Sequence, residues 1–171
     1  MGKITVLGLG PSIHEFNPVE FELSVGVNDI WKFIKSDVIV CLDNPSIFTP
    51  ERLKIINESK PEAFYSQMVA WDERPDFKKI NILPSYPDTY LNLDANEFYK
   101  SYCSPFVAVQ VGYKYYGATE IHLYGVDLLN HPHLNEVYCA KIKKHFIVLK
   151  AALNQKGCDL IVHGNGILKD L

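Results

Sequence analysis

The chain is 171 residues long, with 47% hydrophobic and 22% charged residues and a formal net charge of −3. This size and composition are typical of one globular domain, which we expect to span residues 1–171 and to bury a sizeable core. The negative charge argues against a nucleic-acid partner, because it provides no broad basic field. No apolar stretch is long enough to cross a bilayer, and the first residues lack the length and cleavage site of a signal peptide.

The cysteines are far apart in the sequence, and none belongs to a C-x-x-C pair: Cys41, Cys103, Cys139 and Cys158. This spacing argues against a zinc site and against a thioredoxin-like redox motif. We therefore expect reduced thiols and a cytoplasmic location.

Short apolar runs alternate with helical patterns along the chain. The runs are rich in Val, Ile and Leu and end at Gly, Asn, Asp or Pro, which predicts buried strands over 3–8, 22–27, 37–42, 62–66, 79–83, 120–126 and 159–164. Helices are predicted over 49–59, 104–117 and 134–157. The segment from about 68 to 100 is less regular, and we interpret it as an ordered excursion or a flap over the site.

Capping residues mark the ends of the predicted helices. Thr49 and Ser104 are predicted N-caps, each followed by a proline at the first helical position, and Gly117 and Gly157 are predicted to end their helices. Strands that alternate with helices indicate an α/β fold. We expect a single Rossmann-like domain whose mostly parallel sheet is covered by helices on both faces.

Glycine and small polar residues gather where the predicted strands end. Ligands of an open parallel sheet bind beyond the carboxyl ends of the strands. A glycine-rich turn there lets backbone N–H groups approach a phosphate, and a helix N-terminus favours negative charge. Five strand ends fit this pattern: 8–12, 28–29, 43–46, 125–127 and 163–166.

Each of these signals also has a structural explanation. Gly8 and Gly10 lack the third glycine of the dinucleotide fingerprint, so they could form only a tight turn. Asn28 and Asn44 could be turn residues that tolerate left-handed geometry, and Asp127 could cap the segment that follows it. The convergence of five such ends on one edge of the sheet favours ligand binding.

Several segments together resemble a known superfamily in their order along the chain: "GLGPSI" (8–13), "GVNDIW" (26–31), "LDNPSIF" (42–48), residues 104–129 and "LIVHGNGIL" (160–168). They are similar to the bacterial sialyltransferases of glycosyltransferase family 42 and to related G-x-G-P-S domains, a group that includes pterin-diphosphokinase-like proteins. The resemblance covers the whole chain loosely. It implies a nucleotide-sugar donor of the CMP–sialic acid type and a small glycan acceptor.

The resemblance also implies which residues bind the donor. Gly8, Gly10, Ser12, Asn28 and Asn44 would line a site for its cytidine monophosphate, and Ser104 would lie beside the donor at a helix N-terminus. Amides and hydroxyls suit this role, since they meet a base, ribose or phosphate without adding charge. Three neighbours in the same strand-end motifs complete the predicted nucleotide-binding set: Pro11, Ser46 and Asp127.

The chain departs from the family at two places. Leu9 stands where the family turn usually carries Asn, and only residues 128–134 fill the position of the family's long lid and histidine base. His133 and His131 are the predicted catalytic bases, with His133 preferred, because a near-neutral pKa suits them to deprotonate an acceptor hydroxyl. Two solvated loop histidines are the alternative.

The other histidines are weaker candidates for a functional role than His131 and His133. His122 is expected to be structural, and His145 is expected on the solvated face of the long helix. His163 ends the last strand, where a ligand contact and a structural role both stay open.

The leading hypothesis is a glycosyltransferase-like protein that works by direct displacement and needs no cofactor or metal, because no D-x-D pair follows a strand. A nucleotide or pterin diphosphotransferase is one alternative, with Asp43 and Asp127 as its candidate Mg²⁺ ligands. A non-catalytic nucleotide-binding protein is the other. The sequence leaves the oligomeric state open, a homo-oligomer included.

Overall fold

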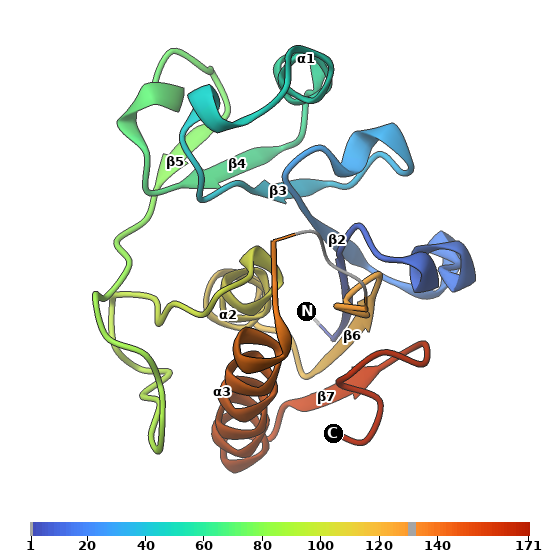
Figure 1. Ribbon diagram of the computed structural model, residues 1–171, viewed down its shortest axis with the longest axis vertical. Coiled ribbons are helices and arrows are strands. Elements are labelled where there is room, and N and C mark those ends of the chain that lie inside the picture. Colours follow the sequence, from blue (N-terminus) through green and yellow to red (C-terminus); the bar gives the residue numbers. More distant parts are fainter. Residues whose placement is uncertain (1, 130–132) are drawn as a thin grey trace.

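A computed structural model describes residues 2–129 and 133–171. This part of the chain forms a seven-stranded sheet in the order β5-β4-β3-β2-β1-β6-β7 (Figure 1). Each strand is parallel to its neighbours. The strands are β1 Lys3–Leu7, β2 Leu23–Val27, β3 Val38–Val40, β4 Ala63–Ser66, β5 Phe77–Lys79, β6 Glu120–Tyr124 and β7 Asp159–Val162.

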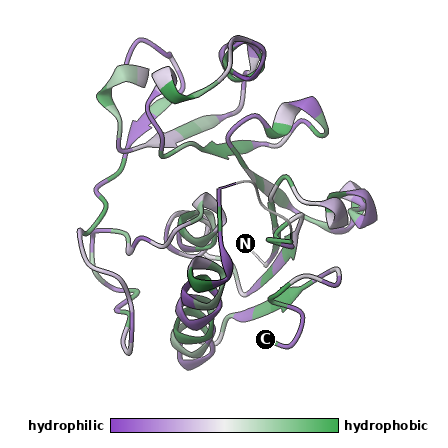
Figure 2. Ribbon diagram, in the orientation of Figure 1, coloured by the Kyte–Doolittle hydropathy of each residue, from purple (hydrophilic) through white to green (hydrophobic). Residues whose placement is uncertain are grey.

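Helices cover both faces of the sheet, which explains why the strands are nearly continuous apolar runs. The helices α2 (Ser104–Tyr116) and α3 (Glu136–Gln155) pack on one face, and α1 (Pro50–Glu58) packs on the other (Figure 1). Figure 2 shows hydrophobic strands between helices with mixed surfaces. The predicted α/β, Rossmann-like fold with a parallel sheet is confirmed. Short 3-10 helices fill several connections: η1 Pro11–Glu15, η2 Pro18–Glu20, η3 Ile30–Lys32, η4 Pro45–Ile47 and η5 Val69–Trp71.

The helix α2 lies deep in the molecule, with its residues from 105 to 112 all buried. Gly112 lets it approach the sheet closely, because a Cβ there would collide with the Ile4 side chain. Gly117 ends the helix in the left-handed conformation, with φ of 62°, as predicted. The N-terminus of α2 is thereby held at the carboxyl edge of the sheet.

The predicted helix starts are correct to within two residues. Thr49 caps α1 through its side-chain oxygen, which accepts the Arg52 N–H at 3.4 Å. The prediction that Ser104 caps α2 is wrong, because Cys103 is the extended residue at the cap and Ser104 already belongs to the first turn. The long helix begins at Glu136, after the N-cap Asn135.

The irregular segment after β5 is an ordered excursion. Leu91, Leu93 and Phe98 are buried in the core beside α2, and Ile82 forms a parallel bridge with Phe98. The Lys114 ammonium of α2 donates to two carbonyls of the excursion, those of residues 95 and 97. The excursion also supplies part of the wall of a cavity at the carboxyl edge of the sheet.

Candidate functional site

The order of the strands places a topological switch at β1. The chain runs from β1 to β5 on one side and then returns to place β6 on the other side of β1. Connections leave β1 and β6 in different directions at this point, which is where open α/β sheets form their ligand crevices. The glycine turn after β1, residues 8–12, which we call the opening turn, and the loop after β6 lie at this switch.

The opening turn packs closely against the end of β6 and is hydrogen-bonded to it. The Gly8 N–H donates to the Tyr124 carbonyl at 2.8 Å, and the Gly10 N–H donates to the Gly125 carbonyl at 2.7 Å. A Cβ on Gly8 would collide with the Gly125 carbonyl. The two glycines are therefore required by the close approach of two backbones, and both of their amide donors are used within the protein.

Asp127 binds the residue that follows this turn. One of its oxygens, Oδ2, accepts both the Ser12 N–H and the Ser12 hydroxyl at 2.9 Å, while the Gly125 N–H donates to the same hydroxyl at 2.8 Å. Asp127 is 4% exposed. We call this arrangement the Ser12–Asp127 lock; it places the protein's own carboxylate at the start of η1, next to Pro11, where the sequence predicted a ligand phosphate.

Asn28 occupies a left-handed backbone conformation after β2, with φ of 50°. Its N–H donates to the Val40 carbonyl at 3.2 Å. The side-chain Oδ1 is buried, and no residue among 2–129 and 133–171 donates to it. Buried polar atoms normally have partners, so this oxygen marks a place where the protein leaves an acceptor unused.

Asn44 and Ser46 form a local turn after β3. The Asn44 Oδ1 accepts the Ser46 N–H at 3.0 Å and thereby caps η4. Both residues are exposed. This geometry matches the turn-forming role considered from the sequence, and it leaves the Asn44 amide group at the surface of the carboxyl edge.

A buried ion pair holds the turn after β2 to α1. Asp29 is 0% exposed, and its Oδ1 accepts the Arg52 Nε–H at 3.0 Å and the Nη2–H at 2.6 Å. The Lys32 Nζ lies 3.3 Å from the other oxygen. Burial by itself raises the pKa of Asp29, but the hydrogen bonds and charge of Arg52 and the charge of Lys32 outweigh it, so the pKa is lowered.

We expect Arg52→Met to lower the free energy of unfolding at pH 7 by about 2 kcal/mol, less than for a fully buried pair because Arg52 is partly exposed and Lys32 remains. The lowered Asp29 pKa stabilises the fold at pH values above the unfolded-state pKa of about 3.9, and this stabilisation is lost as the pH falls through the folded-state pKa. The free energies of unfolding of wild type and Arg52→Met, measured with urea, should therefore differ less below pH 4 than at pH 7. Lys54→Met, which removes an exposed pair with Glu58, is the control, and an equal loss at both pH values would contradict the assignment.

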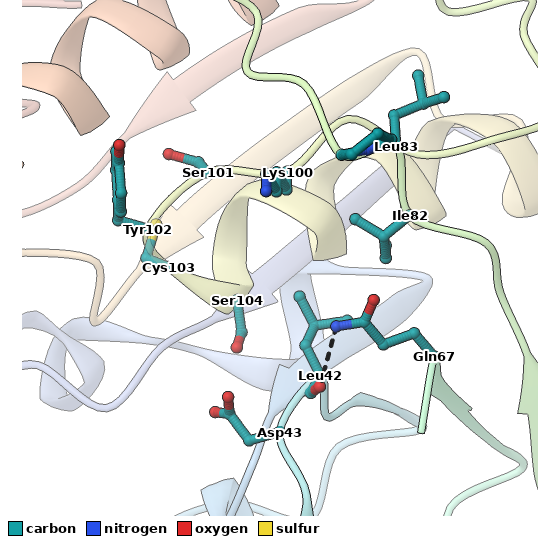
Figure 3. A pocket seen from close by; sticks show the side chains of 11 residues that line it. Leu42, Asp43, Gln67, Ile82, Leu83, Lys100, Ser101, Tyr102, Cys103 and Ser104 are labelled. Carbon is teal, nitrogen blue, oxygen red and sulfur yellow. Dashed lines mark hydrogen bonds between the residues drawn. The ribbon is translucent and has the colours of Figure 1, made fainter. Parts of the chain in front are cut away.

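A cavity of about 400 Å³ lies at the carboxyl edge of the sheet, between β3, β4 and α2. Its walls come from the ends of β3 and β4, from the excursion and from the segment leading into α2 (Figure 3). Ser104, predicted to lie beside the donor, lines it. The other lining residues are Leu42, Asp43, Gln67, Ile82, Leu83, Pro84, Lys100, Ser101, Tyr102 and Cys103.

Polar groups of three elements face this cavity. The Asp43 carboxyl, after β3, and the Ser104 hydroxyl, in the first turn of α2, point toward each other across one end (Figure 3). The Gln67 Nε2–H donates to the Leu42 carbonyl at 3.3 Å, which fixes the amide and turns its Oε1 away from Leu42. The cavity thus offers a carboxylate, a hydroxyl at a helix N-terminus and an amide oxygen.

The histidines are spread over different places. His133, the preferred base, is exposed in the turn before α3, and His131 lies outside the described residues. The prediction that His145 faces solvent is wrong: it is 1% exposed, its Nδ1 shares a 2.9 Å hydrogen bond with the Ser101 hydroxyl, and its ring stacks on Tyr86. The helix face that carries His145 packs against aromatic residues of the excursion, which the helical pattern alone did not reveal.

His163 and His122 contact each other. The His163 Nε2 lies 2.7 Å from the His122 Nδ1, and the His122 Nε2 lies 2.6 Å from Glu120 Oε1. The His163 ring stacks on Tyr124, with centroids 4.0 Å apart. Burial and the neighbouring His122 lower the pKa of His163. These partners are all internal, and neither histidine lines the cavity between β3, β4 and α2.

Within residues 2–129 and 133–171, no three histidine, cysteine or acidic side chains come together as metal ligands would. Over the same residues, no helix has the length and apolar character needed to cross a membrane. All four cysteines are free thiols, and burial raises the pKa of Cys41 and of Cys103 to about 12, so neither is a reactive thiolate.

Comparison with known proteins gives one informative likeness. A point mutant of the alpha-2,3/8-sialyltransferase CstII has a similar solved structure, with a TM-score of 0.54 over 98% of this chain and 84% of that chain. The two sequences are 17% identical, so the likeness establishes a shared fold. No protein-family model matches the chain, and no curated protein sequence matches it.

The structure separates the predicted site residues into groups. Gly8, Gly10, Ser12 and Asp127 do come together, but their donors are used within the protein: the two glycines donate to carbonyls at the end of β6, and Ser12 donates to Asp127. Ser104 lines the cavity instead. Gln67 and residues 100–103 were not among the predicted site residues. Gln67 follows a predicted strand end and could have been found by the rule applied to the other strands; residues 100–103 carry no such signal.

Proposed function

We propose that the chain binds a cytidine nucleotide-activated acidic sugar at the carboxyl edge of its sheet and transfers the sugar to an acceptor hydroxyl. The observation that carries the proposal is a cavity at this edge in a fold like that of a sialyltransferase. Fold likeness alone does not define an activity, so the proposal depends on the groups that face the cavity. Its volume is within the range of small-molecule sites.

The cavity's polar groups suit a nucleoside monophosphate. The first turn of α2, with Ser104, favours the phosphate, because a helix N-terminus attracts an anion and the hydroxyl can donate to it. The fixed Gln67 amide presents an acceptor oxygen, which matches the exocyclic amine of cytosine and not the keto group of uracil. Asn28, with its unused oxygen, and Asn44 would add donors and acceptors from the neighbouring strand ends.

The proposed reaction is a direct displacement. The acceptor oxygen attacks the anomeric carbon as a base takes its proton, and the bond from that carbon to the phosphate oxygen breaks to release CMP. His133 is the proposed base, and the α2 N-terminus would stabilise the charge that develops on the leaving phosphate. Donor binding and transfer are separate parts of this proposal, since a nucleotide-binding protein without transferase activity would use the same cavity.

Calorimetric titration with CMP and UMP tests the binding part. We expect CMP to bind more tightly than UMP, and Ser104→Ala and Asn28→Ala each to weaken CMP binding about tenfold, or about 1.4 kcal/mol. Asn154→Ala, at an exposed position near the end of α3, serves as the control and should bind as the wild type does. If CMP does not bind, or if Ser104→Ala and Asn28→Ala both bind it normally, the proposed function is wrong.

A further inference from the structure

The cavity contains a carboxyl group, that of Asp43, to which none of the described residues donates a hydrogen bond. The backbone of Asp43 is fixed, because its carbonyl accepts the Trp71 Nε1–H at 2.9 Å. Its side chain is half-buried, and no donor among the described residues bonds to it. Burial raises the Asp43 pKa, and the charge of Arg52 offsets this only in part. Asp29 and Asp127, in contrast, each accept two hydrogen bonds.

A carboxylate in this position needs a ligand that donates hydrogen bonds. An ionised carboxylate has acceptor sites only, so it repels a phosphate and binds hydroxyl or amino groups. Asp43 faces Ser104 across one end of the cavity, which is the end proposed for the phosphate (Figure 3). In a nucleotide, the group attached directly to the phosphate is the ribose, and its two neighbouring hydroxyls can bond to the two oxygens of one carboxylate.

We infer that Asp43 binds the 2′- and 3′-hydroxyls of the ribose, so that the cavity selects ribonucleotides over 2′-deoxyribonucleotides. The inference rests on the proposed function, because it assumes that a nucleotide occupies the cavity with its phosphate at α2. It assigns to Asp43, one of the predicted strand-end residues and a candidate Mg²⁺ ligand, a role in specificity. Hydrogen bonds to a charged acceptor are among the stronger ones, so the loss of one hydroxyl should be measurable.

The test compares CMP with 2′-deoxy-CMP by calorimetric titration of wild type, Asp43→Ala and Asp43→Asn. We expect wild type to bind 2′-deoxy-CMP about tenfold more weakly than CMP, or about 1.4 kcal/mol. Asp43→Ala should bind the two nucleotides with affinities within about twofold of each other, since neither sugar then has a charged acceptor. Asp43→Asn keeps the shape of the side chain and one acceptor oxygen, so its ratio should lie between the two.

Asp159→Asn, which changes an exposed carboxyl at the amino end of β7, is the matched control and should keep the wild-type ratio. Circular dichroism and urea unfolding establish that each variant is folded before titration. Equal affinities of wild type for the two nucleotides, or an unchanged ratio in a folded Asp43→Ala, would overturn the inference while the proposed function stands. If wild type binds neither nucleotide, the proposed function fails and the inference fails with it.

Discussion

Asp127→Ala is expected to lower the free energy of unfolding by about 3 kcal/mol, because it leaves the Ser12 N–H and hydroxyl without their acceptor in a buried site. The segment after β7 also packs against Asp127: Gly164 approaches its Oδ1 closely, and Gly166 approaches its backbone. Urea unfolding at pH 7 measures the loss.

A double-mutant cycle with Ser12→Ala identifies the source of this stability. If the Ser12–Asp127 lock is the cause, the two substitutions together should cost clearly less than the sum of their separate effects. A loss within about 0.5 kcal/mol for Asp127→Ala would show that the lock contributes little. Inorganic phosphate that stabilises Asp127→Ala, but not wild type, would show that the opening turn can hold an anion once the carboxylate is removed.

Gly10→Val is expected to destabilise the fold by at least about 3 kcal/mol, or to lower the melting temperature by roughly 10 °C. A Cβ at this position would lie 2.5 Å from the Asp127 Oδ2 and 2.9 Å from the Gly125 carbonyl oxygen, and backbone atoms cannot easily move away. Differential scanning calorimetry gives the melting temperature. Loss of nucleotide binding in this variant would therefore be no evidence for a phosphate at the turn.

Gly2→Ala is the matched control for this substitution. The added Cβ would meet the flexible end of the Glu22 side chain at 3.0 Å, so little change in melting temperature is expected. A Gly10→Val protein that melts like wild type would mean that β1 and β6 can separate at this turn, contrary to the packing described above.

The fold could be predicted from the sequence because the strands are buried on both faces. Each strand core lies within its predicted run, apart from β5, which is at residues 77–79 and not at 79–83. That strand is an edge strand with two exposed lysines, so the more apolar run that follows it was the stronger signal. Two apolar residues of that run, Ile80 and Ile82, instead pack in the core on the α2 side of the sheet.

The candidate site could be predicted only in part. Ser104 came from the resemblance to the sialyltransferases, and the small polar residues at strand ends led to the opening turn. Neither signal could distinguish a free hydrogen-bond donor from one already bonded to Asp127. That difference depends on which carboxylate lies beside which amide, across 115 residues of sequence. The role proposed for Asp43 depends on the same kind of long-range information, namely that no donor within residues 2–129 and 133–171 bonds to its side chain.

The position of β1 has a consequence for how the chain folds. This strand has β2 on one side, which follows closely in sequence, and β6 on the other, so that Lys3 pairs with Glu120. During synthesis, β1 therefore keeps one edge without a partner until most of the chain has left the ribosome, and exposed edges of this kind favour aggregation. Such non-local pairing makes folding slow, and this interior strand of the finished sheet is among the last to be completed.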